Sequence, residues 1–208
     1  MFQNFYDKVA VLNQIERTDR YKAFRDHAIF RGLEYQVFHS LPFSTPRDSF
    51  NHSHYALIHK FYNDGVDNLL ILEDDCRFQN LDKFQDIHYE LLKNKWKMVY
   101  YGCNARPYPD HEEPTYCSPH LRHISAAFTT HAIGYTRPVM KLILDVYNPN
   151  EGQMFDAWLD EYLLKVVNAH VTVPFLAVQA PVKSDLWNRE VDYTDTFQAS
   201  EQYLKGIV

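Results

Sequence analysis

The chain has 208 residues, of which 46% are hydrophobic and 15% aromatic, and its formal net charge is -6. This length and composition predict a single globular domain over residues 1–208, whole or cut from a longer protein, and exclude a disordered or fibrous chain. Because an acidic chain has no overall basic field, nucleic acid is not an expected partner.

The cysteines and the hydropathy pattern indicate in which cellular compartment the protein is expected. Cys76, Cys103 and Cys117 form no CxxC pair and no disulfide framework, which predicts free thiols in a reducing environment. No window is apolar over the roughly 18 residues that a bilayer requires, and the first residues lack a signal-peptide pattern. We therefore expect a soluble cytoplasmic protein without a transmembrane segment. The oligomeric state is left open by the sequence.

Strand and helix patterns alternate along the first half of the chain. The expected strands are 8–13, 35–40 and 68–74, and the expected helices are 17–32, 51–65 and 81–96. We expect Asn51 or Ser53 to cap the second helix, Gly65 to end it, and the proline-containing segment 41–50 to be a loop.

The second half continues the alternation less regularly. A strand over 97–103, short strands within 124–136, helices over 137–147 and 154–168, and a strand over 170–179 interrupted by Pro174 are expected. The polar segment 104–120 is expected to be a long loop, and the tail from Ala180 to be irregular. The whole pattern predicts an α/β fold with a mostly parallel central sheet flanked by helices, in which ligands bind at the carboxyl ends of the strands.

The segment NLLILEDDCRF, residues 68–78, is the most informative. Its apolar strand ends in Glu73, Asp74 and Asp75. Neighbouring carboxylates with little access to water are electrostatically unfavourable unless a bound cation or a proton neutralises their charge. Alternation along an extended chain would place Glu73 and Asp75 on one side and Asp74 on the other. Such a pair could share Mg²⁺ or Mn²⁺, which prefer oxygen ligands and bridge carboxylates to diphosphates. A solvated acidic turn is the alternative interpretation.

The order of several motifs resembles that of glycosyltransferase family 25, which includes bacterial lipooligosaccharide galactosyltransferases and the collagen galactosyltransferases. The motifs are VAVLNQIERTDR (9–20), NHSHYALIHKFYNDGVDNLLILEDD (51–75), TTHAIGYTRPVMKLIL (129–144), QMFDAWLDEYL (153–163) and VTVPFLAVQ (171–179), with Ser184-Asp185 soon after. The resemblance covers most of the chain, and its strongest part is the block from Ser-His to Glu-Asp-Asp.

This resemblance implies a GT-A fold, the fold of nucleotide-diphospho-sugar transferases. It implies a metal-dependent transferase that moves a sugar from a nucleotide-diphosphate sugar, with UDP-hexose favoured, to a hydroxyl of a glycan or glycoprotein acceptor. Glu73 and Asp75 would bind Mn²⁺ or Mg²⁺, which stabilises the leaving diphosphate. The candidate donor-binding residues are Asn13, Arg17, Arg20, His54 and Asp74.

An inverting transfer, which the resemblance suggests, needs a carboxylate that accepts a proton from the acceptor hydroxyl. Asp156 is our candidate because it matches the aspartate that leads a helix in the family, and because its apolar neighbours could raise its pKa. Asp160 and Glu161 are alternatives that could instead belong to a solvated helix face. Asp156 itself could be only an acid that the helix dipole favours near the N-terminus.

Other candidates rest on weaker signals. His131 could line the acceptor side, His170 could be a late metal ligand, and Tyr108 and Tyr116 could form a mobile lid. Two other functions stay open: a nucleotide-sugar-binding module without turnover, and a metal-assisted phosphoryl or nucleotidyl transfer enzyme. The sequence contains no GxxxxGK[ST] loop that would favour the last of these.

Overall fold

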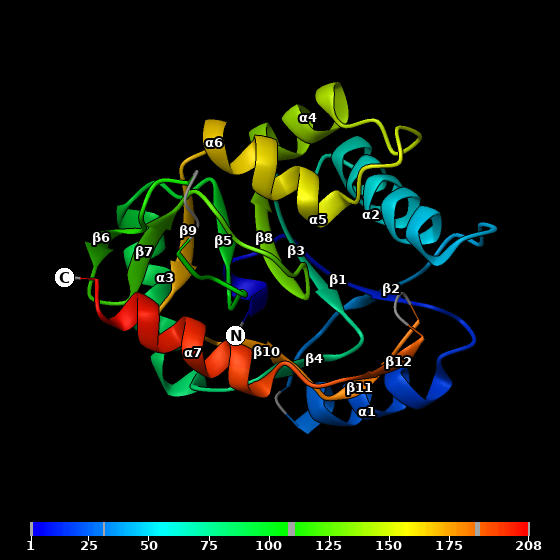
Figure 1. Ribbon diagram of the computed structural model, residues 1–208, viewed down its shortest axis with the longest axis horizontal. Helices are drawn as coiled ribbons and strands as arrows, with labels where there is room; N and C mark the ends of the chain where they lie inside the picture. Colours follow the sequence, from blue (N-terminus) through cyan, green and yellow to red (C-terminus); the bar gives the residue numbers. More distant parts are fainter. Residues whose placement is uncertain (1, 31, 108–110, 186–187, 208) are drawn as a thin grey trace.

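A computed structural model describes residues 2–30, 32–107, 111–185 and 188–207. Its centre is an eight-stranded sheet with the order β2-β1-β3-β8-β5-β9-β7-β6 (Figure 1). The strands are β1 (Lys8–Asn13), β2 (Gln36–His39), β3 (Asn68–Glu73), β5 (Met98–Tyr100), β6 (Thr115–Ser118), β7 (Leu121–Ile124), β8 (Ala132–Thr136) and β9 (Ala169–Thr172).

The strand pairings confirm a mostly parallel sheet. Strand β1 is parallel to β2 and β3, and β5 is parallel to β9. Strand β8 is antiparallel to both β3 and β5, so β5 runs in the direction of β3. Strand β7 is antiparallel to both β9 and β6. Within the described sheet, only β7 and β8 are therefore reversed.

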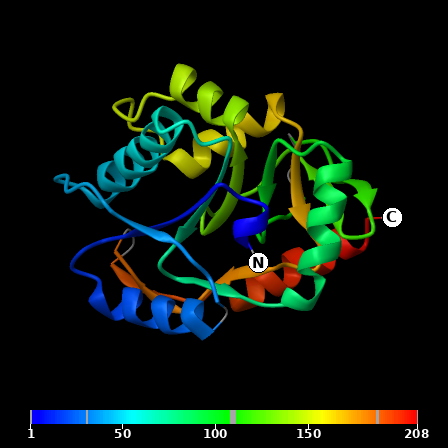
Figure 2. The ribbon, with the colours of Figure 1, turned by 180° about the vertical axis from the view of Figure 1, so that it is seen from behind.

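Helices cover both faces of this sheet. On one face lie α2 (Pro46–Asn63), α4 (Arg137–Val146), α5 (Phe155–Trp158) and α6 (Leu164–Val166), and on the other lie α1 (Thr18–Phe30) and α3 (Phe84–Lys93) (Figures 1 and 2). The two layers explain the continuous apolar runs of β1 and β3. Ala10 and Ile71 pack into one core, whereas Val11 and Leu72 pack into the other.

Smaller elements complete the fold. Two short turns of 3-10 helix are η1 (Phe2–Asn4) and η2 (Leu81–Lys83). Strands β4 (Cys76–Phe78) and β10 (Ala177–Gln179) form one ribbon, β11 (Val182–Ser184) and β12 (Arg189–Val191) form another, and α7 (Thr194–Lys205) packs along β10. All three cysteines are free. No helix in the described ranges is long and apolar enough to cross a membrane.

Helix α2 begins earlier than the sequence predicts. Its N-cap is Thr45, whose hydroxyl accepts a 3.1 Å hydrogen bond from the Asp48 amide, and Pro46 occupies the first turn. Proline is tolerated there because the first helical amides have no partner inside the helix. The prediction that Asn51 or Ser53 caps this helix is therefore wrong. Both residues lie within the helix, after its first turn, and their side chains are buried.

Two segments expected to be irregular contain regular structure. The segment 104–120 includes edge strand β6, which has little burial of its own and so shows no clear apolar alternation. The tail from Ala180 contains β11, β12 and α7, whose Phe197, Ser200 and Leu204 are buried at helical spacing. The segment 154–168 is not one continuous α-helix, because a π-helical turn (Leu159–Leu163) separates α5 from α6.

Candidate functional site

A cavity of about 180 Å³ lies at the carboxyl ends of β1 and β3. Glu73 is the last residue of β3 and lines this cavity together with Asp74 and Asp75. Asp156 from the first turn of α5 also lines the cavity, and Gln179 and Asp185 line it from the C-terminal segment. The topology thus brings together residues from distant parts of the chain.

The three consecutive acids do not follow strand alternation. Strand β3 ends at Glu73, and Asp74 and Asp75 form a turn that leads into β4. Asp74 therefore does not point away from the other two carboxylates, as alternation would require, because all three line the same cavity. The chain turns at this point instead of remaining extended.

Arg20 on α1 joins two of these acids. Its Nη2 lies 2.7 Å from Asp75 Oδ2 and also forms an ion pair with Asp74 Oδ1. Its Nη1 lies 3.6 Å from Asp185 Oδ2, so one guanidinium faces three carboxylates. The expected donor-binding residue Arg20 is thus placed beside the expected metal ligand Asp75.

The acid cluster has more negative charge than Arg20 can neutralise. Asp75 is only 4% exposed, and burial raises its pKa to about 7, with Glu73 and Asp74 adding to the rise and Arg20 opposing it. Burial also raises the pKa of Asp74, against the influence of Arg20 and Asn13. Oδ1 of Asp75 is buried and accepts no hydrogen bond from the described residues.

Glu73 has different partners. Thr130 Oγ1 donates a 2.5 Å hydrogen bond to Glu73 Oε1, and His54 Nε2 lies 3.4 Å from the same oxygen. Burial favours the neutral form of Glu73, but His54 and Thr130 outweigh it and lower the pKa of this carboxyl. The ring of His54 is buried and stacks on Phe155, so this histidine supports Glu73 from behind the cavity wall.

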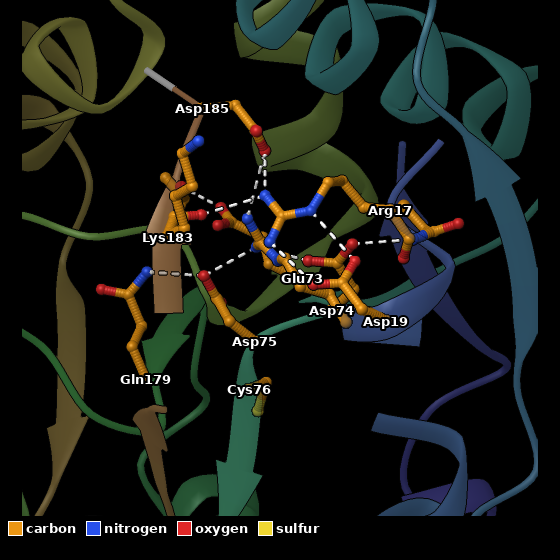
Figure 3. A network of polar contacts seen from close by, with 12 residues as sticks. Arg17, Asp19, Glu73, Asp74, Asp75, Cys76, Gln179, Lys183 and Asp185 are labelled. Atoms are coloured by element: carbon orange, nitrogen blue, oxygen red, sulfur yellow. Dashed lines mark hydrogen bonds and ion pairs between the residues drawn. The ribbon is translucent and has the colours of Figure 1, made fainter. Parts of the chain in front are cut away.

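Asn13 and Arg17 do not line the cavity but bind two acids that do, Asp74 and Asp185. Asn13 is buried, and its Nδ2 donates a 2.7 Å hydrogen bond to Asp74 Oδ2. Arg17 Nη1 donates to the carbonyl of Lys183 at 2.9 Å and to Asp185 Oδ2 at 2.5 Å. Figure 3 shows how Arg17 and Asp185 approach each other from segments far apart in the sequence.

Asp156 is a partly buried acid at the start of α5. It lies in the first turn of α5, and its Oδ1 accepts a 2.8 Å hydrogen bond from the Ala157 amide. Burial raises its pKa, and the charge of Glu73 adds to the rise. Asn51 fixes the start of this helix, since it accepts from the Phe155 amide and donates to the Gln153 carbonyl, each at 2.9 Å.

The alternative bases lie elsewhere. Asp160 is 2% exposed, accepts a 2.8 Å hydrogen bond from the Ala127 amide and lies 3.3 Å from His111 Nε2. The expectation of a solvated face is therefore wrong for Asp160. Glu161 is exposed and accepts a 2.7 Å hydrogen bond from Gln153.

Several weaker expectations do not match the structure. His131 is fully buried, and its Nε2 lies 3.2 Å from the Ala177 carbonyl oxygen, so it supports β10 and does not line the cavity. His170 lies in β9, outside the acid cluster. Tyr116 belongs to edge strand β6 and packs against Arg122, which excludes the expected lid role at this cavity. Tyr108 lies outside the described residues.

Three residues of the site have no role predicted from the sequence. Thr130 binds Glu73, and its neighbour Thr129 has φ of +80°, a strained value for a β-branched residue. Gln179 Nε2 lies 3.5 Å from Asp75 Oδ2, and Asp185 pairs with Arg17. All three had a signal only as parts of the family-25 motifs, because their partners lie far away in the sequence.

The donor atoms fit a hard divalent cation. The available ligands are carboxylate oxygens, the kind that Mg²⁺ and Mn²⁺ prefer, and the buried unpaired Oδ1 of Asp75 has the character of an open ligand atom. Arg20 already lies against the other oxygen of Asp75. A cation at this cluster would therefore share the acids with Arg20.

No protein-family model and no curated protein match this sequence. Among solved structures, the chain is similar to a glycosyltransferase involved in the glycosylation of the major capsid of PBCV-1, with a TM-score of 0.52, 12% identity, and coverage of 94% of this chain and 99% of that one. The chain has a GT-A fold.

Two further solved structures are also similar. A197 from STIV has a TM-score of 0.50 and 10% identity, with coverage of 78% of this chain and 79% of that one. UDP-glucose pyrophosphorylase complexed with UDP-glucose has a TM-score of 0.49 and 9% identity, with coverage of 96% and 81%. Because these identities are low, the likeness extends to the fold alone, and membership of glycosyltransferase family 25 stays a prediction.

Proposed function

We propose that this protein is a metal-dependent glycosyltransferase that transfers a sugar, with inversion, from a nucleotide-diphosphate sugar to a hydroxyl of a glycan or glycoprotein. A UDP-hexose is the proposed donor. The observation that carries the proposal is the cavity at the carboxyl ends of β1 and β3, which buried acids, Arg20 and Asp156 line together. In an open α/β sheet this edge is where ligands bind.

The donor would bind on the side of β1 and β3. Asp75, assisted by Glu73, would hold Mn²⁺ or Mg²⁺, and the bound cation would stabilise the negative charge of the departing diphosphate. Arg20 and Arg17 offer guanidinium donors for phosphate oxygens, since both now bind carboxylates that a diphosphate could replace. Asn13 and Asp74 would contact the nucleoside or sugar, and His54 would keep Glu73 in position.

The acceptor would bind near α5. Asp156 would take the proton from the attacking hydroxyl, and its raised pKa suits this role because a base is most effective when its pKa lies near the working pH. Asp156 lines the same cavity as the acid cluster, so the sugar would lie in this cavity between the base and the leaving group. An opposite approach of nucleophile and leaving group is the geometry that inversion requires.

Calorimetric titration with UDP, with and without Mn²⁺, tests the proposal. In the wild-type protein we expect Mn²⁺ to strengthen UDP binding at least about 10-fold, and EDTA to reverse the effect. Asp75→Asn should remove this dependence on Mn²⁺ because it removes a charged ligand. Asp82→Asn, at an exposed acid paired only with neighbouring Lys83, is the control and should bind like the wild type.

Unchanged Mn²⁺-dependent UDP affinity in Asp75→Asn would refute the assigned metal site. A screen of nucleotide sugars for Mn²⁺-dependent hydrolysis then identifies the sugar. Binding of UDP without hydrolysis or transfer of any donor would instead support a nucleotide-sugar-binding module without turnover.

A further inference from the structure

A second cluster of ligand-type side chains lies at the other end of the sheet. It consists of Cys117 on β6, His123 on β7 and His170 on β9, which are the three strands at one edge of the central sheet (Figure 1). One ligand atom of each residue lies within 4.8 Å of the other two. Strands β8 and β5 separate β9 from β3, which carries Glu73, so this cluster is independent of the cavity.

The strand register brings these residues together. His123 is directly opposite His170 in the antiparallel pairing of β7 with β9, and their ring centroids are 4.5 Å apart. Cys117 falls where the pairing of β6 with β7 shifts, between Tyr116 and Ser118. Such an irregularity re-aims a side chain relative to a regular strand.

The two histidines have ring nitrogens that the fold leaves without hydrogen bonds. His170 is 1% exposed, and neither of its ring nitrogens has a hydrogen-bond partner among the described residues; the backbone of Met98 approaches the ring without hydrogen-bond geometry. Nδ1 of His123 is also buried and has no hydrogen-bond partner in the described part of the chain, although the Ala169 backbone and the Asn168 side chain approach this ring. Because unpaired buried polar atoms are unfavourable, a ligand for these nitrogens would stabilise the fold.

The protonation states suit metal binding. Burial, with a smaller contribution from His123, lowers the pKa of His170 to about 4, and burial lowers the pKa of His123. Both rings are therefore neutral at pH 7, which is the form that ligates a metal. Burial raises the pKa of the Cys117 thiol, so Cys117 is not a reactive thiolate unless a cation lowers its pKa.

We propose that Cys117, His123 and His170 bind one Zn²⁺ ion that links β6, β7 and β9. One thiolate and two imidazoles are ligands that zinc prefers, whereas the oxygen-only acid cluster suits Mg²⁺ or Mn²⁺. Tetrahedral zinc would hold these ligand atoms about 3.3–3.6 Å apart, so side-chain shifts of about 1 Å close the site. Water or an added ligand would take the fourth position.

Titration of the chelator-treated protein with Co²⁺ and Zn²⁺ tests this site. All variants carry Asp75→Asn, which weakens metal binding at the acid cluster. With the three ligands intact, we expect one equivalent of Co²⁺ to produce a thiolate-to-metal charge-transfer band that Zn²⁺ abolishes. Competition with a chromophoric chelator should give a Zn²⁺ dissociation constant below about 1 μM.

Cys117→Ser should remove the charge-transfer band, and Cys117→Ser and His170→Asn should each weaken Zn²⁺ binding at least about 100-fold. His59→Gln, at an exposed histidine on α2, is the control and should leave the charge-transfer band and the Zn²⁺ affinity unchanged. Because Cys117 is only partly buried, Cys117→Ser is expected to fold even if His170→Asn does not. A Zn²⁺ dissociation constant above about 1 μM, or the same affinity in Cys117→Ser, would overturn the proposal.

Discussion

At the scale of single residues, the site is defined by an excess of negative charge around two arginines. Arg20 faces Asp74, Asp75 and Asp185, and Arg17 shares Asp185. Burial raises the pKa of Asp75, and the charges of Glu73 and Asp74 add to the rise, although in water this acid would be fully ionised at neutral pH. A divalent cation would relieve this excess, and protonation would do so in its absence.

Asp75 should make the metal-free protein less stable as pH rises. Its pKa is raised from 3.8 to about 7 on folding, so the stabilisation from its proton is complete below pH 3.8 and is lost as pH rises through 7. Between pH 5 and pH 8 the stability of Asp75→Asn relative to wild type should therefore increase by on the order of 2 kcal/mol. Urea unfolding in EDTA measures this change, and an unchanged difference would contradict the assigned pKa.

Asp156→Asn should separate binding from turnover. The amide keeps the shape of the side chain but cannot accept the proton of the acceptor, so donor turnover should fall at least about 100-fold. UDP affinity in the presence of Mn²⁺ should stay near that of wild type. Glu161→Gln, on the exposed alternative acid, should retain turnover. Turnover is measured with the donor that the hydrolysis screen identifies. If Asp156→Asn retains this turnover, another residue is the catalytic base.

At the scale of elements, helix α2 connects both sides of the cavity. His54 contacts Glu73 at the end of β3, and Asn51 binds the backbone at the start of α5. Both side chains lie on the buried side of α2. The helix thus positions the acid cluster and Asp156 relative to each other, which explains why polar residues lie on its buried side.

Asn51→Ala should be more damaging than loss of the helix cap. The substitution leaves the Phe155 amide and the Gln153 carbonyl without their partner, and we expect it to lower the free energy of unfolding by about 2–4 kcal/mol. Thr45→Ala, which removes only the exposed N-cap, should lower it by about 1 kcal/mol. Urea unfolding of both variants compares the two effects, and equal losses would argue against a linking role for Asn51.

At the scale of the whole molecule, the C-terminal segment closes the site. Strand β10 places Gln179 beside Asp75, and β11 leads to Asp185, which binds Arg17 near the start of α1. Helix α7 then packs back along β10 (Figure 1). A chain without this segment would lose a wall of the cavity and one partner of each arginine.

Asp185→Ala should loosen the ribbon of β11 and β12. It removes the ion pairs of Asp185 with Arg17 and Arg20, which join this ribbon to α1. We expect amide hydrogen exchange in β11 to accelerate about 10-fold while exchange in β1 and β3 stays unchanged. Glu190→Gln, an exposed position on β12, is the control. Equal protection of β11 in Asp185→Ala and wild type would show that other contacts hold the ribbon.

Local pattern in the sequence was enough to predict most of the central strands. Segments 8–13 and 68–74 are continuous apolar runs because both faces of the sheet are covered, and the structure places β1 and β3 there within one residue. The position of Glu73 at a carboxyl edge followed from the same pattern. Edge strand β6 and the C-terminal elements were missed because partly exposed strands and an amphipathic helix with few apolar residues carry a weak periodic signal.

The sequence by itself determined the α/β class and the placement of the acids at the end of a buried strand, because both depend on the hydrophobicity of neighbouring residues. Only the tertiary structure decided that Arg20 joins Asp74 to Asp75, that Asp156 lines the same cavity, and that Cys117, His123 and His170 meet. These contacts join residues on separate elements. Their geometry depends on strand order, register and helix packing, which local periodicity does not encode.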